Sequence, residues 1–216
     1  MSDLSSLVTA EHFRYIAERT TREDDLLRSL KQAAVAEGIP SIWISPEQAS
    51  FMQILLKLSK AREVVEVGTL AGYSAIVMAR ALPENGRVRT IEIEAKHADF
   101  ARRWIAKSDV ADRIQVSLGA GMDVLPAFAA DSADVAFLDA DKGSYPKYLA
   151  ECLRIVRKGG LMLVDNAFAF GQLFAQTPKD KEVGAIRAFN EIMAKESRLQ
   201  SVIVPIGDGL WVGVKR

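Results

Sequence analysis

From Arg62 onward, short apolar runs alternate with stretches of helical periodicity, and this alternation restricts the fold more than any other feature of the chain. The apolar runs are REVVEV, RVRTIEI, RIQVSL, ADVAFLDA and LMLVDN. Strands that alternate with helices predict a parallel sheet with helices on both faces and right-handed crossovers. The stretch SVIVPIGDGLWVGVKR predicts two more strands around a Gly-Asp-Gly turn. We therefore expect an α/β fold: a Rossmann-like, doubly wound, mostly parallel seven-stranded sheet whose last strand is antiparallel.

The stretches between the apolar runs predict helices over 72–82, 95–107, 122–129 and 145–157, the last closed by glycines at 159 and 160. A further helix is expected to begin near Pro178, with Thr177 as its cap. Residues 1–60 also have helical periodicity. In SPEQASFMQILLKLSK, Ser45 stands at the N-cap, Pro46 at the first helical position and Gln48 at the capping-box position.

Length and composition indicate one large domain. The chain has 216 residues, 49% of them hydrophobic, which is enough to form a sizeable core. We expect residues 1–216 to form a single domain, with a helical segment over 1–60 and the Rossmann-like core over 61–216. Lys+Arg and Asp+Glu each total 28, so no net charge attracts nucleic acid or an anionic membrane.

The cysteine content and the apolar runs predict the compartment. The one cysteine, Cys152, lies in an apolar helical pattern and is expected to be a core residue. A single cysteine excludes an intrachain disulfide, and no apolar run is long enough to span a membrane. The cytoplasm is therefore the expected location.

The loop within VVEVGTLAGYS is the first candidate ligand site, because ligands of such sheets bind beyond the carboxyl ends of the strands. A dinucleotide is one candidate, since Glu92, 20 residues after Gly72, could hold ribose hydroxyls. However, Leu70 breaks the G-x-G-x-x-G pattern, and Glu66 would repel a pyrophosphate. S-adenosylmethionine has a ribose but no phosphate, and Glu66 would attract its cationic methionyl end. The loop favours this cofactor, although a plain turn with a solvated acid also fits it.

A second group of polar residues follows the fourth and fifth predicted strands. FLDADKGSY carries Asp139, Asp141 and Lys142, and LVDN ends in Asp165 and Asn166. On neighbouring parallel strands, Asp139, Asp165 and Asn166 would meet at one edge and offer hard oxygen ligands to Mg²⁺ or Ca²⁺. Only two histidines occur, both outside these motifs, which argues against zinc. One such acid alone would read as a helix cap.

In these motifs the chain resembles the small cation-dependent class I O-methyltransferases, which include catechol O-methyltransferase and the caffeoyl-coenzyme A O-methyltransferases. The resemblance runs from ISPEQASFMQILLKL to IGDGLWVGVKR and rests on EVGTLAGYSA, FLDADKGSY, GGLMLVDN and PIGDGL, in this order and spacing. It implies S-adenosylmethionine and a divalent cation, Mg²⁺ or else Ca²⁺ or Mn²⁺, as cofactors. A small phenolic acceptor is the implied partner.

The resemblance also implies roles for individual residues. Asp139, Asp165 and Asn166 match the metal ligands, and Lys142 matches the general base, with Asp139 beside it in the catalytic group. Lysine can accept a proton when burial and a nearby cation disfavour its charged form. The matching cofactor positions are Ile44, Glu66, Gly68, Thr69, Tyr73, Ser74, Glu92, Ile93, Ala120, Gly121, Asp139 and Asp141. Of these, Glu66, Gly68, Tyr73 and Ser74 would surround the methionyl part, Glu92 would bind the ribose, and residues 119–121 would face the adenine.

The loop after Asn166 departs from the family, because Ala169 stands where tryptophan is common. That loop shapes the acceptor pocket in the family, so the acceptor does not follow from the resemblance. Three alternatives stay open: the same chemistry on a hydroxylated tRNA base, a nucleotide-linked oxidoreductase, and a non-catalytic partner protein on this scaffold. Extra apolar residues in the N-terminal helices predict a homodimer, as in bacterial relatives: Leu4, Leu7, Val8, Phe13, Tyr15 and Ile16.

Overall fold

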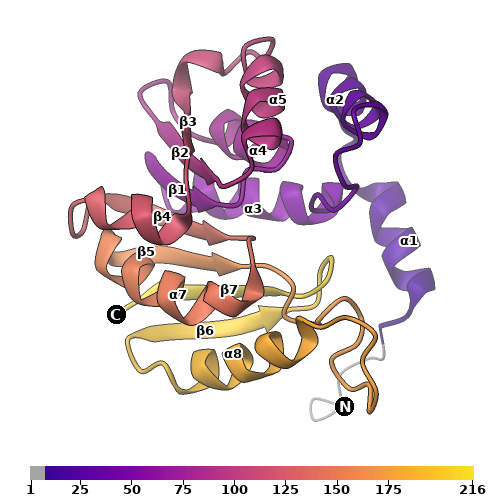
Figure 1. Ribbon diagram of the computed structural model, residues 1–216, viewed down its shortest axis with the longest axis vertical. Helices are drawn as coiled ribbons and strands as arrows, with labels where there is room; N and C mark the ends of the chain where they lie inside the picture. The colour runs from indigo at the N-terminus through magenta and orange to yellow at the C-terminus, as the bar shows by residue number, and fades with distance from the viewer. Residues whose placement is uncertain (1–7) are drawn as a thin grey trace.

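The computed structural model describes residues 8–216 and contains a seven-stranded sheet in the order β3-β2-β1-β4-β5-β7-β6. The strands are β1 (Glu63–Val67), β2 (Arg87–Glu92), β3 (Ile114–Leu118), β4 (Ala133–Leu138), β5 (Val156–Val164), β6 (Leu199–Val204) and β7 (Leu210–Lys215). All neighbours from β3 to β5 pair in parallel, whereas β7 is antiparallel to both β5 and β6. The predicted α/β, mostly parallel sheet with an antiparallel last strand is confirmed (Figure 1).

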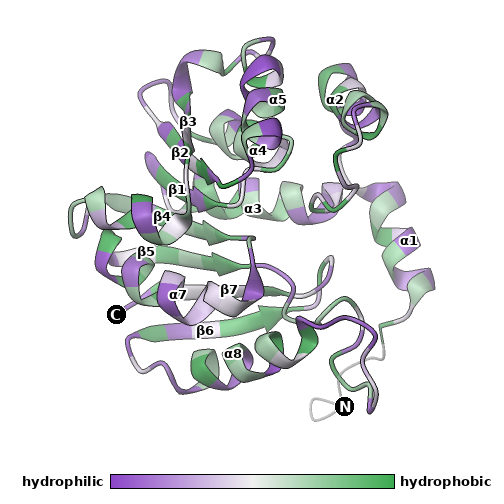
Figure 2. Ribbon diagram, in the orientation of Figure 1, coloured by the Kyte–Doolittle hydropathy of each residue, from purple (hydrophilic) through white to green (hydrophobic). Residues whose placement is uncertain are grey.

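Helices cover both faces of this sheet. The α-helices of the described residues are α1 (Ala10–Arg19), which lies apart from the sheet, α2 (Asp25–Ala36), α3 (Pro46–Leu58), α4 (Tyr73–Ala81), α5 (Ala95–Ile105), α6 (Gly121–Val124), α7 (Tyr145–Ile155) and α8 (Val183–Lys195). Along β4, Val135 and Phe137 pack with α2 to α5, whereas Ala136 and Leu138 pack with α7 and α8. This alternation is the period-two pattern of a strand with helices on either side. In Figure 2 the central strands are accordingly mostly hydrophobic and α5 is mixed.

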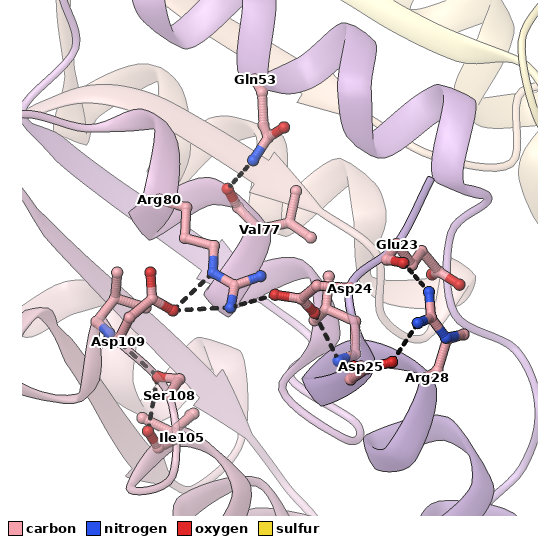
Figure 3. A network of polar contacts seen from close by, with 12 residues as sticks. Glu23, Asp24, Asp25, Arg28, Gln53, Val77, Arg80, Ile105, Ser108 and Asp109 are labelled. Atoms are coloured by element: carbon pink, nitrogen blue, oxygen red, sulfur yellow. Dashed lines mark hydrogen bonds and ion pairs between the residues drawn. The ribbon is translucent and has the colours of Figure 1, made fainter. Parts of the chain in front are cut away.

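An arginine ties α2 to the core. Arg80, in the last turn of α4, pairs with Asp24 at the start of α2 at 2.8 Å and with Asp109 at 2.7 Å, as Figure 3 shows. The Asp24 side chain also accepts from Leu27 N and caps α2. The two carboxylates hold the guanidinium from both sides, and this fixes α2 against α4.

Helix α1 lies at the outer edge of the molecule, beside one end of α3 and away from the strands (Figure 1). None of its residues is buried, and Tyr15 is 60% exposed. Two residues of the predicted dimer face, Leu4 and Leu7, lie outside the described residues. Within residues 8–216, no helix is long and apolar enough to cross a membrane.

Three predicted boundaries are wrong. Helix α7 ends at Ile155, and the glycines at 159 and 160 lie inside β5, where Gly159 has φ +77° and the register with β4 shifts. They form an irregularity in the strand rather than a helix stop. The helix expected over 122–129 is α6 followed by a 3₁₀ turn, Leu125–Ala127, at Pro126.

The third wrong boundary concerns α8, which begins at Val183 and not near Pro178. Lys179 N donates to Gln172 Oε1, and Glu182 N donates to the Asp180 side chain. These side-chain acceptors keep 177–182 in turns and delay the helix by more than one turn.

Candidate active site

A cavity of about 850 Å³ opens at the carboxyl ends of β1, β2, β4 and β5. Because these strands are parallel, the residues that follow each of them meet at one edge of the sheet. Most of the predicted site residues line it: Ile44, Gly68, Thr69, Tyr73, Ser74, Glu92, Ile93, Gly121, Asp139, Asp141, Lys142, Asp165 and Asn166. The structure therefore joins the predicted cofactor loop and the predicted metal group in one cavity.

The loop after β1 is held by Glu92. One carboxylate oxygen accepts from Thr69 N at 3.1 Å and from Leu70 N at 2.7 Å, and the other accepts from Glu94 N at 2.9 Å. Leu70 has φ +48°, a strained conformation for a non-glycine residue. Glu92 thus orders the loop besides facing the cavity.

Gly68 is required by the approach of another main chain. It has φ +100°, and a Cβ there would lie 1.9 Å from the Asp139 carbonyl oxygen. The absence of a side chain at Gly68 therefore makes room for the main chain that follows β4.

Glu66 does not line the cavity, although the sequence placed its charge there. It is fully buried, Ser74 Oγ donates to its Oε1, and its Oε2 has no hydrogen-bond partner in the described part of the chain. Burial raises the pKa of Glu66 to about 8, against the opposing effect of the hydrogen bonds from Ser74 and Thr90. The carboxyl is therefore mostly neutral at pH 7, and it contacts a residue of the cavity wall, Ser74.

Lys142 is buried at the start of the 3₁₀ turn Lys142–Ser144 and has two side-chain contacts. Its Nζ lies 3.1 Å from Asp139 Oδ1 and donates to Tyr145 Oη at 2.7 Å. Burial, followed by the charge of Asp139, holds the pKa of Tyr145 well above its usual range. The neutral Tyr145 phenol accepts a hydrogen bond from Lys142 and keeps the lysine Nζ beside Asp139.

Asp165 lies next to Asp139 because β4 and β5 pair with Leu138 opposite Val164. Asp165 is 6% exposed, and the side-chain amide of Gln48 donates to its Oδ1 at 2.8 Å. Burial, and then the charge of Asp139, raise the pKa of Asp165 to about 7. Two carboxylates are thus forced close together in a poorly solvated place.

The donor set fits a hard divalent cation. Asp139 and Asp165 offer carboxylate oxygens, Asn166 offers an amide oxygen, and a cation would relieve the repulsion between the acids. Within residues 8–216, no group of three or more His, Cys, Asp and Glu side chains is placed to hold a metal. A metal site here would therefore need the amide oxygen of Asn166 and further oxygens from water or from a bound substrate.

Two other predicted positions differ from expectation. Ala120 does not line the cavity, although Gly119 and Gly121 on either side of it do. Ala169 is fully buried against Val183 and Ile186, and the next residue, Phe170, lines the cavity instead. The loop thus keeps an aromatic ring at the cavity, one position later than the family pattern implied.

Sequence reasoning missed several cavity residues. Gln48 was assigned to a capping box, yet only Ser45 caps α3 and the glutamine reaches Asp165. Asp208 was read only as a turn residue. Glu182 accepts from Lys142 N at 3.1 Å, and no local pattern marked it. Tyr148, which also lines the cavity, donates to Asp141 at 2.7 Å.

Comparison with known proteins gives a consistent result. A family model described as O-methyltransferase matches residues 17–216. The chain is 36% identical over 204 residues to a catechol O-methyltransferase of Niastella koreensis, covering 93% of this chain and 90% of that protein. It is 34% identical over 192 residues to a catechol O-methyltransferase of Mycobacterium tuberculosis, covering 88% and 87%.

Solved structures agree. The O-methyltransferase from Bacillus cereus in complex with SAH superposes with a TM-score of 0.85 at 33% identity, covering 94% of this chain and 96% of that one. The O-methyltransferase TomG from Streptomyces achromogenes in complex with SAM gives 0.81 at 30% identity, covering 95% and 96%.

Proposed function

This chain belongs to the O-methyltransferase family, and from that membership we propose that it transfers the methyl group of S-adenosylmethionine to a hydroxyl of a small catechol-like or phenolic acceptor, with the help of a divalent cation. One observation carries the proposal: a single cavity is lined both by the loop after β1 with Glu92 and by Asp139, Lys142, Asp165 and Asn166. Methyl transfer needs a donor and an activated hydroxyl in one place.

The cofactor would lie over β1 and β2. Glu92 already accepts three backbone N–H groups and lines the cavity, where ribose hydroxyls could donate to its remaining lone pairs. Relatives named as complexes with SAM or SAH support this assignment. Ser74 and Tyr73 line the wall nearest Glu66, where the methionyl part would lie.

The acceptor would lie at the ends of β4 and β5. Asp139, Asp165 and Asn166 would hold Mg²⁺, or else Ca²⁺ or Mn²⁺, and the cation would stabilise the oxyanion of a chelated catechol. Lys142 is the proposed proton acceptor, because Tyr145 and Asp139 keep its Nζ at this end of the cavity. Phe170 and Trp43 offer aromatic walls to a phenolic ring.

The sharpest test is a methyl-transfer assay with labelled S-adenosylmethionine and catechol, hydroxycinnamate, flavonoid and modified tRNA acceptors. We expect transfer to a small ortho-dihydroxy acceptor, loss of activity in excess chelator and recovery with Mg²⁺. Transfer to modified tRNA and to none of the small acceptors would contradict the proposed phenolic acceptor and favour a tRNA base. Full activity in excess chelator would show that no divalent cation is needed and would contradict that part of the proposal.

We also propose that residues 1–216 form one methyltransferase domain, with an N-terminal helical segment before the Rossmann-like core, which acts in the cytoplasm as a homodimer. The exposed apolar side chains of α1 support the dimer, since Tyr15 is 60% and Ile16 is 38% exposed. Sedimentation at micromolar concentration tests it: we expect twice the chain mass, and a double variant Tyr15→Glu, Ile16→Glu should sediment as monomer. A monomeric unmodified protein would contradict the dimer.

A further inference from the structure

The Gly-Asp-Gly turn between β6 and β7 reaches the cavity through Asp208. One oxygen of this carboxylate accepts from Asn166 Nδ2 at 3.2 Å and from Phe170 N at 2.7 Å, and the other accepts from Gly171 N at 3.0 Å. Phe168 N donates to the Asp208 carbonyl at 2.8 Å. Asp208 therefore connects the residue after Asp165 with the loop that brings Phe170 to the cavity.

The chemistry of this contact decides which way the Asn166 amide faces. An ionised carboxylate only accepts hydrogen bonds, so the amide must turn its NH₂ group toward Asp208. Its carbonyl oxygen then points away from Asp208. With the opposite orientation, two acceptor oxygens would face each other and the amide could offer only nitrogen, which binds no hard cation, to the other side.

We propose that Asp208 is a positioning residue that fixes the Asn166 amide with its oxygen presented as a metal ligand, and that it ties the loop 167–171 to the same point. The inference rests on the proposed metal site. It gives the PIGDGL stretch a role beyond that of a hairpin turn: the turn is close enough to act on the site because β7 lies directly beside β5.

The test measures Mn²⁺ binding by water-proton relaxation, at pH 8.5, on purified protein without cofactor or acceptor. Asp208→Ala should bind Mn²⁺ about 10–100-fold more weakly than the unmodified protein, the range typical for partners that orient a ligand. Arg187→Met is the matched control. Arg187 donates to the carbonyls of Gln172, Leu173 and Ala175, so its loss loosens the segment 172–175, which directly follows the loop 167–171, without touching Asn166. It should leave Mn²⁺ affinity close to that of the unmodified protein.

An exchange of the two groups separates orientation from charge and serves even if Asp208→Ala fails to fold. Asn166→Asp alone places two carboxylates face to face. Adding Asp208→Asn restores a donor opposite an acceptor and the original total charge. If residue 166 needs a hydrogen-bond donor facing it from position 208, the double variant should bind Mn²⁺ more tightly than Asn166→Asp. If only the charge near the site matters, Asn166→Asp should bind more tightly.

The inference is overturned if Asn166→Asp binds Mn²⁺ more tightly than the double variant, or if a folded Asp208→Ala binds Mn²⁺ as tightly as the unmodified protein. A weakening by Arg187→Met equal to that by Asp208→Ala would reduce Asp208 to a loop anchor and also overturn it. No Mn²⁺ binding by the unmodified protein is a different result, because it overturns the proposed metal site and this inference together.

Discussion

The side-chain amide of Gln48 donates to Oδ1 of Asp165 at 2.8 Å, in a buried contact between residues 117 positions apart. It joins the first turn of α3 to the end of β5. Gln48 also fills the space beside Gly207, where a Cβ would lie 2.0 Å from its Oε1. The helical N-terminal part of the chain thus supports the same group of side chains that the sheet assembles.

Gln48→Leu should therefore weaken Mg²⁺ activation. The change leaves a buried carboxylate without its donor, which should cost about 1–3 kcal/mol of stability and raise the Mg²⁺ needed for half activity about tenfold. Urea unfolding and Mg²⁺ titration of activity measure the two effects. Gln53→Leu is the matched control, since Gln53 on the same helix donates to the Val77 carbonyl instead. An equal Mg²⁺ shift in both variants would contradict a direct role of Gln48.

Glu92→Gln should weaken S-adenosylmethionine binding by about 1–3 kcal/mol, because the ribose hydroxyls lose a charged acceptor. Gln is preferred to Ala here because it keeps an acceptor for Thr69 N and Leu70 N, whose hydrogen bonds to Glu92 order the loop after β1. Calorimetric titration with the cofactor checks the affinity. An unaltered affinity would disprove the ribose assignment.

Lys142→Ala should lower kcat about 10²–10⁴-fold while cofactor affinity changes little. The loss should be smaller for a more acidic acceptor, which gives up its proton more readily. Steady-state assays with phenolic acceptors of graded acidity measure this difference. Lys147→Ala, at an exposed position of α7, should retain full kcat. Equal losses for strongly and weakly acidic acceptors would exclude Lys142 as the base.

Asp165→Asn and Asp139→Asn should each raise the Mg²⁺ needed for half activity at least about tenfold, because each removes charge from a site that would hold a hard cation. Cofactor binding should largely survive in Asp165→Asn, since the cofactor loops lie over β1 and β2. Metal titration of activity and cofactor calorimetry separate the two effects. Asp123→Asn, at an exposed position of α6, is the control and should behave like wild type. An unchanged metal requirement in Asp165→Asn would point to a metal-free enzyme.

Glu66 should make the protein less stable as the pH rises. Its folded pKa of about 8 exceeds its ordinary value of 4.5, so between these values the folded protein keeps a proton that the unfolded chain releases. Stability therefore falls with rising pH across this window. Glu66→Gln should remove this fall and gain a few kcal/mol relative to wild type between pH 5 and pH 8, at about 1.4 kcal/mol per pKa unit. Urea unfolding at both pH values measures it, with Glu63→Gln on the same strand as control. Parallel pH profiles for wild type and Glu66→Gln would contradict the buried proton.

The sequence predicted the sheet and most of the cavity because both follow from local patterns. Apolar runs give the strands, and parallel pairing brings Glu92, Asp139 and Asp165 to one edge of the sheet. Errors in the predicted ends of the helices do not change this. Gln48 and Asp208 could not be found in this way. Their local patterns, a capping box and a hairpin turn, are satisfied by Ser45 and the glycines, so their side-chain contacts depend on the tertiary fold. The charge state of Glu66 was also beyond local reasoning, because it depends on complete burial.

The position of β7 between β5 and β6 has a consequence for how the chain is made. During synthesis β6 emerges before β7, yet within residues 8–216 it pairs with no strand other than β7. A nascent chain that ends after β6 therefore has a finished β1 to β5 with an open edge, and Asn166 has no Asp208 to face. Nascent chains stalled on either side of residues 208–215 should accordingly differ in protease resistance. We therefore expect the site to be completed in one late step, when the final hairpin pairs with β5 and the exposed edge of the sheet passes from β5 to β6.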